Sequence, residues 1–207
     1  MADLHRQALY LEYFTVAYNT VEAIASIGFG YMAGSIALVG FGLDSVVESL
    51  SGLVLIWRLR KHGVVSVDEE GIIEKKAVKF VALTFFILGA YVTFRAIAAL
   101  LLREAAEPSI PGMVIALLSL IVMPFLAWRK IIIARQIGSR ALLADAKETL
   151  ACAFLSIALL AGLAGNYFFG FWQADPLAAL VIAVFLFHEG YEGWTEGGVA
   201  EGDKDLH

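Results

Sequence analysis

The stretch Leu43-Asp44-Ser45-Val46-Val47-Glu48 places two carboxylates four residues apart within an apolar run from Ile36 to Trp57. On a helix, residues four apart lie on one face, so both acids point the same way. The run is as long as the roughly 20 residues that cross a bilayer. An acid at membrane depth is costly and normally faces a partner, a water-filled cavity or an ion path. The stretch therefore predicts a polar site within a transmembrane helix.

Apolar runs of similar length continue along the chain on both sides of this one. The sequence is 60% hydrophobic and 17% charged, against about 45–50% and about 25% in globular domains. We therefore expect an all-α bundle of six transmembrane helices, forming a single transmembrane domain over residues 1–207 without a cytoplasmic C-terminal domain. The expected helices are 9–31, 36–57, 77–102, 111–128, 141–165 and 176–191, the last being the shortest.

Lysine and arginine residues gather in alternate connections between these runs. The other connections carry only Arg103. Cytoplasmic loops carry an excess of Lys and Arg, so we expect both termini in the cytoplasm and a multi-pass protein of the inner (plasma) membrane. The clustered positive residues are Arg58, Arg60, Lys61, Lys75, Lys76 and Lys79 after the second run, and Arg129, Lys130, Arg135 and Arg140 after the fourth.

Two classes of function are disfavoured by the same composition. The formal net charge is -5, whereas a nucleic-acid partner requires a basic face. The chain offers no credible nucleophile–base pair, and its few histidines lie near the ends or edges of the apolar runs. We therefore expect neither nucleic-acid binding nor enzymatic activity, and we assign no catalytic residue.

A second pair of potential ligands, Glu148 and Cys152, is again four residues apart in an apolar run. We counted about 1.5 Å of rise per residue through a core about 30 Å thick. On this estimate Glu48 lies level with Glu148, and Asp44 lies level with Cys152. The second and fifth helices run in opposite directions, so the four side chains are predicted to meet.

Three carboxylates and one thiol suit a transition metal. Zinc accepts carboxylate oxygen and thiolate sulfur in a tetrahedral site, whereas calcium and magnesium prefer oxygen and more ligands. Four negative charges cannot coexist in a dry membrane site without a cation or protons. An empty site therefore takes up protons and releases them when a metal binds, which is the chemical basis for exchanging metal for protons.

Other polar residues lie within the apolar runs. Asp145 shares a helix face with Glu148, and we consider it an inner gate, an alternative ligand or an ordinary first-turn acid. Glu22 and Asn19 lie deep in the first run, where Glu22 is expected either to form an ion pair with Arg95 or to take part in proton transfer. Asp175-Pro176 is interpreted as an N-cap followed by proline at the first helical position.

Several of these motifs resemble the cation diffusion facilitator (cation efflux) family. Gly34-Ser35-Ile36-Ala37-Leu38, followed by Asp44 and Glu48, is similar to the first hairpin of that family. The segments from Ala144 to Cys152 and from Ala174 to Leu180 are similar to its fifth helix and the entry to its sixth.

The resemblance implies a metal–proton antiporter, commonly a homodimer, that moves zinc or similar ions out of the cytoplasm. By position, Asp44 and Glu48 are the ligands of the second helix. Glu148 and Cys152 stand where the fifth helix of the family usually has His and Asp. The family's usual C-terminal domain is not expected here, so the resemblance is to a short branch whose homodimer is held by membrane helices.

From the residues and the resemblance together we expect a transporter in the lipid bilayer that exports a divalent transition metal in exchange for protons. Zinc is the expected cargo, with Cd²⁺, Co²⁺, Fe²⁺ or Mn²⁺ as alternatives. Two other functions fit the same pattern: a metal-binding membrane sensor or scaffold that does not transport, and an organic-cation/proton exchanger in which the acids are counter-charges.

Overall fold

The computed structural model describes residues 2–61 and 67–199. Within these ranges the chain forms six α-helices and no strand. Five of the helices are long and apolar enough to cross a membrane, which confirms the expected all-α membrane bundle. The helices are α1 (Ala2–Ala33), α2 (Ile36–Lys61), α3 (Val67–Leu102), α4 (Ile110–Ile137), α5 (Arg140–Phe169) and α6 (Ala174–Val199).

With 32 residues, α1 is long enough to cross a membrane, but it is not among the five helices that are also apolar enough. Its inward face carries Glu12, Asn19 and Glu22, none of which is more than 4% exposed. Polar side chains on an inward face lower the hydropathy of a helix without exposing charge to lipid. The low hydropathy of α1 therefore reflects polar groups that belong to the interior of the bundle.

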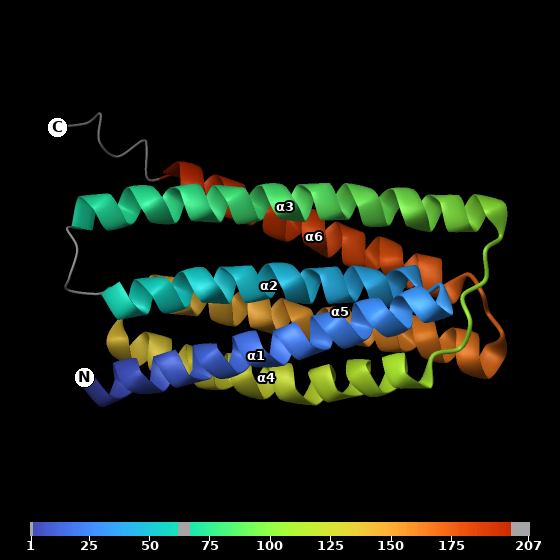
Figure 1. Cartoon of the computed structure of the whole chain (residues 1–207), viewed down its shortest axis with the longest axis horizontal. Helices are drawn as coiled ribbons and strands as arrows, with labels where there is room; N and C mark the ends of the chain where they lie inside the picture. The colour runs from blue at the N-terminus through green and yellow to red at the C-terminus, as the bar shows by residue number, and fades with distance from the viewer. Residues whose placement is uncertain (1, 62–66, 200–207) are drawn as a thin grey trace.

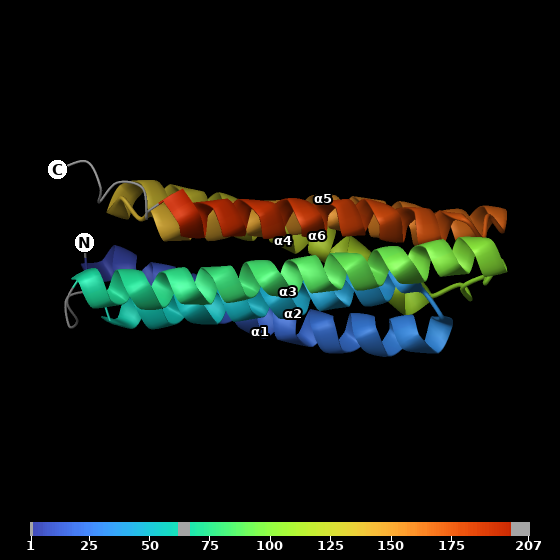
Figure 2. The ribbon, with the colours of Figure 1, turned by 90° about the horizontal axis from the view of Figure 1, so that it is seen from above.

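The six helices form two layers of three. In Figure 1, α3 and α6 run along one edge, α2 and α5 along the middle, and α1 and α4 along the other edge. Figure 2 shows α1, α2 and α3 in one layer and α4, α5 and α6 in the other. The packing agrees with both views, since α1 contacts α4, α2 contacts α5, and α3 contacts α6. The centre of the protein therefore lies between α2 and α5.

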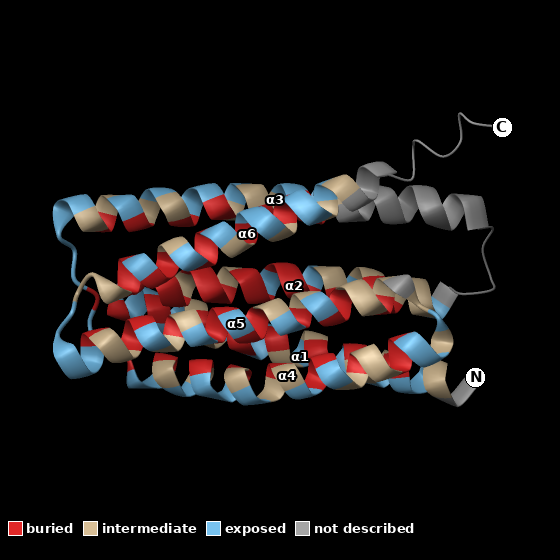
Figure 3. Cartoon of the chain, turned by 180° about the vertical axis from the view of Figure 1, so that it is seen from behind, coloured by how far each residue is buried: buried red, intermediate tan, exposed pale blue. Residues whose placement is uncertain are grey.

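Burial follows this arrangement, and Figure 3 shows buried residues concentrated on the central helices. Of the 18 residues in the most apolar stretch of α2, 61% are buried inside the protein, whereas the corresponding share in α3 is 28%. Large apolar side chains such as Phe94, Leu101 and Ile121 are exposed on the outside of the bundle. An apolar exterior of this extent is not found on soluble monomers, and it fits contact with lipid.

The helices extend beyond the apolar runs that predicted them. α2 ends at Lys61, α3 begins at Val67, and α6 continues to Val199. The connection expected between the second and third apolar runs, residues 58–76, is therefore helical, apart from residues 62–66, which lie outside the described residues. Hydropathy marks only the apolar part of a helix, whereas Glu, Lys and Arg favour helix in the polar turns at the end of α2 and the start of α3.

The two ends of the described chain lie at the same end of the bundle. The start of α1, the end of α6 and the turn between α4 and α5 are at the same end of the bundle (Figure 1). An even number of membrane crossings produces this arrangement. That this end is cytoplasmic stays a prediction from the distribution of positive charges.

The hairpin between α1 and α2 turns at Gly34-Ser35, as predicted. Gly34 has a φ of +65°, a left-handed conformation that glycine adopts without strain. The Ser35 hydroxyl accepts a hydrogen bond of 3.1 Å from the Leu38 amide, which makes Ser35 the N-cap of α2. Further along the pair, a Cβ atom added at Gly42 would lie 2.9 Å from the backbone nitrogen of Ile27, so α1 and α2 approach closely.

Asp175 caps α2 rather than its own helix. Its carboxylate accepts hydrogen bonds from the Ser35 hydroxyl and from the backbone amides of Ile36, at 2.9 Å, and Ala37, at 3.5 Å. α6 already begins at Ala174, so the prediction that Asp175 is the N-cap of the last helix is wrong. The first amides of α2 have no partner within the helix, and Asp175 supplies one from across the bundle.

Candidate metal centre

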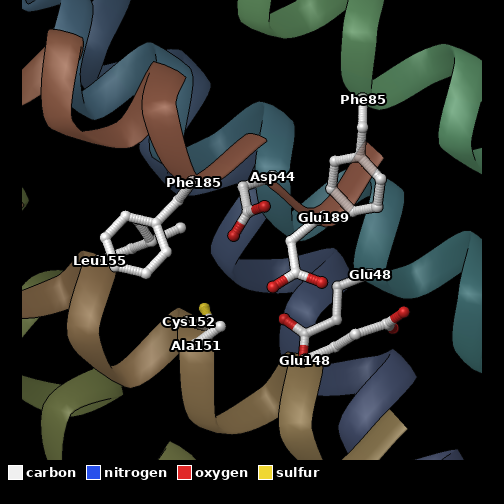
Figure 4. Close-up of a pocket in the computed structure, with 9 residues that line it drawn as sticks. All are labelled: Asp44, Glu48, Phe85, Glu148, Ala151, Cys152, Leu155, Phe185 and Glu189. Atoms are coloured by element: carbon white, nitrogen blue, oxygen red, sulfur yellow. The ribbon is translucent and has the colours of Figure 1, made fainter. Parts of the chain in front are cut away.

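Three of the four predicted ligands meet between α2 and α5. One ligand atom each from Asp44, Glu48 and Cys152 lies within 4.8 Å of the other two. The three residues are 6%, 4% and 1% exposed, respectively. Asp44 and Glu48 are one turn apart on α2, and Cys152 faces them from α5 (Figure 4). Two carboxylates and a thiol at this spacing can bind a single divalent ion.

The space between these side chains is a small pocket with acidic and apolar walls (Figure 4). Both carboxylate oxygens of Glu48 are buried without a hydrogen-bond partner among the described residues. Buried polar atoms in native proteins are almost always paired, so these oxygens are available to a proton or to a bound ion. The pocket is lined by Asp44, Glu48, Phe85, Glu148, Ala151, Cys152, Leu155, Phe185 and Glu189.

Glu148 lines the pocket but does not join the compact group of three ligands. Its Oε2 atom accepts a hydrogen bond of 3.0 Å from the Ser51 hydroxyl on α2. The sequence predicted that Glu148 lies level with Glu48. Ser51 is three residues beyond Glu48, so Glu148 contacts α2 about one helical turn farther along than predicted.

Glu189 on α6 lines the same pocket and was missed by sequence reasoning. The apolar run that predicted α6 ended at Tyr191, which placed Glu189 at the membrane surface. Because α6 continues to Val199, Glu189 lies well inside the helix. A signal was present in the sequence, since Glu189 follows Phe185 by four residues and both side chains face the pocket.

A second buried charged group lies nearer the end of the bundle that holds the start of α1. The Lys130 ammonium binds Asp145 Oδ2, lies 3.2 Å from Glu12 Oε1, and donates a hydrogen bond of 3.2 Å to the Thr149 hydroxyl. The Lys130 side chain is fully buried, so its assignment to a positive cytoplasmic loop is wrong. α4 continues to Ile137 and carries Lys130 into the interior, where two acids neutralise it.

This group changes the interpretation of Asp145. Its Oδ2 atom is bound to Lys130, and Asp145 is not one of the three ligands that converge. Asp145 therefore lies between the metal pocket and the end of the bundle, which is the position expected of an inner gate. In this structure, however, its carboxylate binds the Lys130 ammonium.

Glu22 and Asn19 lie on the inward face of α1. Glu22 Oε2 accepts a hydrogen bond of 2.9 Å from the Ser45 hydroxyl. Arg95 instead lies 3.8 Å from Glu104 near the surface, so the expected ion pair between Glu22 and Arg95 is wrong. Glu22 Oε1 and the Asn19 side-chain amide are buried without a hydrogen-bond partner in the described part of the chain. Glu22 therefore contacts α2 at Ser45, the residue after Asp44, and the role of both residues in a proton path stays a prediction.

Residues 72–196 match the model of the cation efflux transmembrane domain, which is more than half of the chain. The chain belongs to the cation efflux family. It is therefore a multi-pass membrane protein of a family of cation transporters, as the resemblance of its motifs implied. The matched region of this cation efflux protein includes Glu148, Cys152 and Glu189, whereas Asp44 and Glu48 lie before it.

A curated relative of this cation efflux protein extends the likeness toward the N-terminus. The chain is 25% identical over 160 residues to transmembrane protein 163 of Xenopus laevis. That alignment covers 76% of the chain and 55% of the relative. The chain therefore spans about half the length of this relative.

Proposed function

We propose that this cation efflux protein exports a divalent transition metal, with zinc as the best-suited cargo, in exchange for protons. The cargo is bound by Asp44, Glu48 and Cys152, and Glu148 joins them during the cycle. The observation that carries this proposal is the convergence of two carboxylates and one thiol, from two helices, within 4.8 Å at the centre of the bundle.

The kinds of ligand atom favour zinc and its neighbours. Thiolate sulfur and carboxylate oxygen both bind Zn²⁺, and the sulfur disfavours Ca²⁺ and Mg²⁺. Cd²⁺ and Co²⁺ accept the same ligands, and Fe²⁺ and Mn²⁺ bind the carboxylates, so these ions are the expected competitors. An organic cation would gain nothing from a buried thiol, which makes that alternative less suited to the pocket.

The charge of the pocket supports exchange with protons. Asp44, Glu48 and Cys152 would carry three negative charges within a few ångströms if all were ionised, and burial makes such a state very costly. A bound metal or bound protons must therefore neutralise them. Because metal ligands bind in their deprotonated forms, metal binding releases protons. A site that alternates between the two cargoes is the core of an antiporter.

Glu148 is proposed to move between two partners. With Ser51 as its hydrogen-bond partner, it lies one turn from the converged ligands on the side of the Lys130 group. Turning toward the pocket, it would provide a fourth ligand and complete the tetrahedron that zinc prefers. Glu148 would thus connect the metal pocket to the side from which a cytoplasmic ion arrives.

The remaining features of the proposed transporter follow from the family and from the charges of the chain. The protein would lie in the inner (plasma) membrane with both termini in the cytoplasm, and it would form a homodimer through its membrane helices.

The proposed function is tested by zinc uptake into proteoliposomes with an acidic interior. Uptake should be driven by the outward proton gradient and abolished by a protonophore. Asp44→Asn should abolish uptake, whereas Glu104→Gln, at the exposed Arg95 pair, should leave it unchanged. Zinc binding without uptake would indicate a sensor or scaffold. Organic-cation flux that survives chelators and Cys152→Ser would indicate the organic-cation exchanger.

A further inference from the structure

We propose that Glu189 is a further ligand of the transported ion, contributed by α6. This inference rests on the proposed function of the pocket as the metal centre. Glu189 lines the pocket but, like Glu148, lies outside the compact group of three ligand atoms. Its side chain must therefore turn toward the ion, which then has four ligands, three carboxylates and one thiolate from three helices, even while Glu148 stays hydrogen-bonded to Ser51. The ion then joins the α3–α6 pair to the central helices α2 and α5.

The position of Glu189 carries the inference. Figure 4 shows its carboxylate directed into the space that Asp44, Glu48 and Cys152 surround. Phe85 on α3 and Phe185 on α6 form apolar parts of the wall of the same pocket. Both oxygens of Glu48, which is 4% exposed, are without a hydrogen-bond partner among the described residues. These two oxygens can bind an ion that the Glu189 carboxylate also contacts.

α6 is packed closely against α3, so an ion bound to Glu189 on α6 would also be connected to α3. Gly190, next to Glu189, lets α6 approach α3 closely, since a Cβ atom at this position would lie 3.2 Å from the carbonyl oxygen of Ala82. Gly89 on α3 makes a similar approach to the ring of Phe187. α3 and α6 are therefore a tightly packed pair, and α6 also contacts α2 and α5.

A ligand on this pair gives the ion a mechanical role. The three converged ligands belong to α2 and α5 alone. Without Glu189, the ion would therefore make no bond to the outer pair of helices, α3 and α6. With Glu189, binding and release of the ion change the attraction between the central helices and the α3–α6 pair. A ligand shifts a conformational equilibrium only through such a difference in contacts, so Glu189 would link occupancy of the site to movement of the outer pair.

The experiment compares Glu189→Gln with Glu192→Gln in the purified full-length protein. Both changes remove one carboxylate charge from α6, but Glu192 is exposed and lies 3.5 Å from His188 at the surface. Zinc affinity is measured by competition with a chromophoric chelator. Glu189→Gln should weaken zinc binding by about tenfold or more, because even second-shell changes at metal sites cost about 10–100-fold. Glu192→Gln should bind zinc as the wild type does.

Cobalt absorption supplies a second readout that a purely structural role would not change. The intensity and position of the visible bands of Co²⁺ depend on the number and kind of its ligands. Loss of Glu189 should therefore change the spectrum of the cobalt-loaded protein, whereas Glu192→Gln should leave it unchanged. If Glu189→Gln does not fold, Glu189→His replaces an oxygen ligand with nitrogen and should retain binding with an altered spectrum.

The outcomes separate this inference from the proposed function. If wild-type protein binds and transports zinc and Glu189→Gln matches it in affinity and in cobalt spectrum, Glu189 is not a ligand, and the proposed function stands. An unchanged cobalt spectrum in Glu189→His overturns the inference in the same way. If wild-type protein binds neither Zn²⁺ nor Co²⁺, the proposed function itself fails.

Discussion

The ammonium nitrogen of Lys130 lies 3.2 Å from Oε1 of Glu12, although the two residues are 118 positions apart and both side chains are fully buried. Asp145 binds the same ammonium, so the group joins α1, α4 and α5. A buried ammonium is tolerated only with counter-charges. The three helices are therefore fixed to one another near the end of the bundle that holds the α4–α5 turn.

Removing the ammonium should destabilise the protein. Lys130→Met leaves two buried acids without their cation, and breaking a buried charge pair costs about 3–5 kcal/mol. Lys147→Met is the matched control, since Lys147 is exposed on α5. Thermal unfolding in detergent should show a clearly lower midpoint for Lys130→Met only. Equal midpoints for the two variants would show that the buried group contributes little to stability.

The cap that Asp175 provides to α2 should be measurable in the same assay. Asp175→Ala removes the acceptor for the amides of Ile36 and Ala37. Leaving a buried donor unsatisfied costs about 1–3 kcal/mol, so the unfolding midpoint should fall. Glu104→Ala changes an exposed acid and should have little effect. A midpoint for Asp175→Ala equal to that of Glu104→Ala would mean that water replaces the cap at no cost.

The close approach of α1 and α2 predicts opposite effects for two glycine substitutions. Gly42→Ala places a methyl group 2.9 Å from the backbone nitrogen of Ile27, so the helices must separate and stability should fall. At Gly28 an added Cβ meets no atom within 4 Å. Gly28→Ala should therefore raise stability slightly, by up to about 1 kcal/mol, because alanine favours helix. Equal stability of the two variants would contradict close packing at Gly42.

The thiol of Cys152 should decide which metals bind well. Cys152→Ser replaces a soft ligand with a weak oxygen ligand, and soft ions depend most on thiolate. Competition titrations should show a large loss of Cd²⁺ and Zn²⁺ affinity and a much smaller loss for Mn²⁺. Misfolding would lower the affinity for all three ions alike, so the difference between the metals also controls for folding. Equal losses for all three ions, or none, would exclude Cys152 as a ligand.

The sequence was informative where a pattern depends on one helix at a time. Apolar runs and the Gly34-Ser35 turn were enough to predict six helices and the first hairpin. The spacing of Asp44 and Glu48 predicted their shared face, and rise per residue placed Cys152 opposite them. Each of these features follows from helical geometry and the thickness of a bilayer.

The features that escaped prediction depend on contacts between helices. Lys130 looked like a surface charge because its two counter-charges are distant in the sequence. Asp175 looked like a local cap because the α2 amides that it binds are about 140 residues away in the chain. Glu189 was not recognised as a candidate ligand because the apolar run that predicted α6 is shorter than the helix. Lys130 and Asp175 are buried with partners on other helices, which a single helix pattern does not reveal.

The central claim, that Asp44, Glu48 and Cys152 together bind the transported metal, is tested most directly by X-ray absorption at the zinc edge on the purified, zinc-loaded protein. We predict one sulfur at about 2.3 Å and the remaining ligands as oxygen at about 2.0–2.2 Å, with the sulfur lost in Cys152→Ser and the zinc lost in Asp44→Asn. Zinc bound stoichiometrically without a sulfur neighbour, or bound equally well by Asp44→Asn, would contradict the claim.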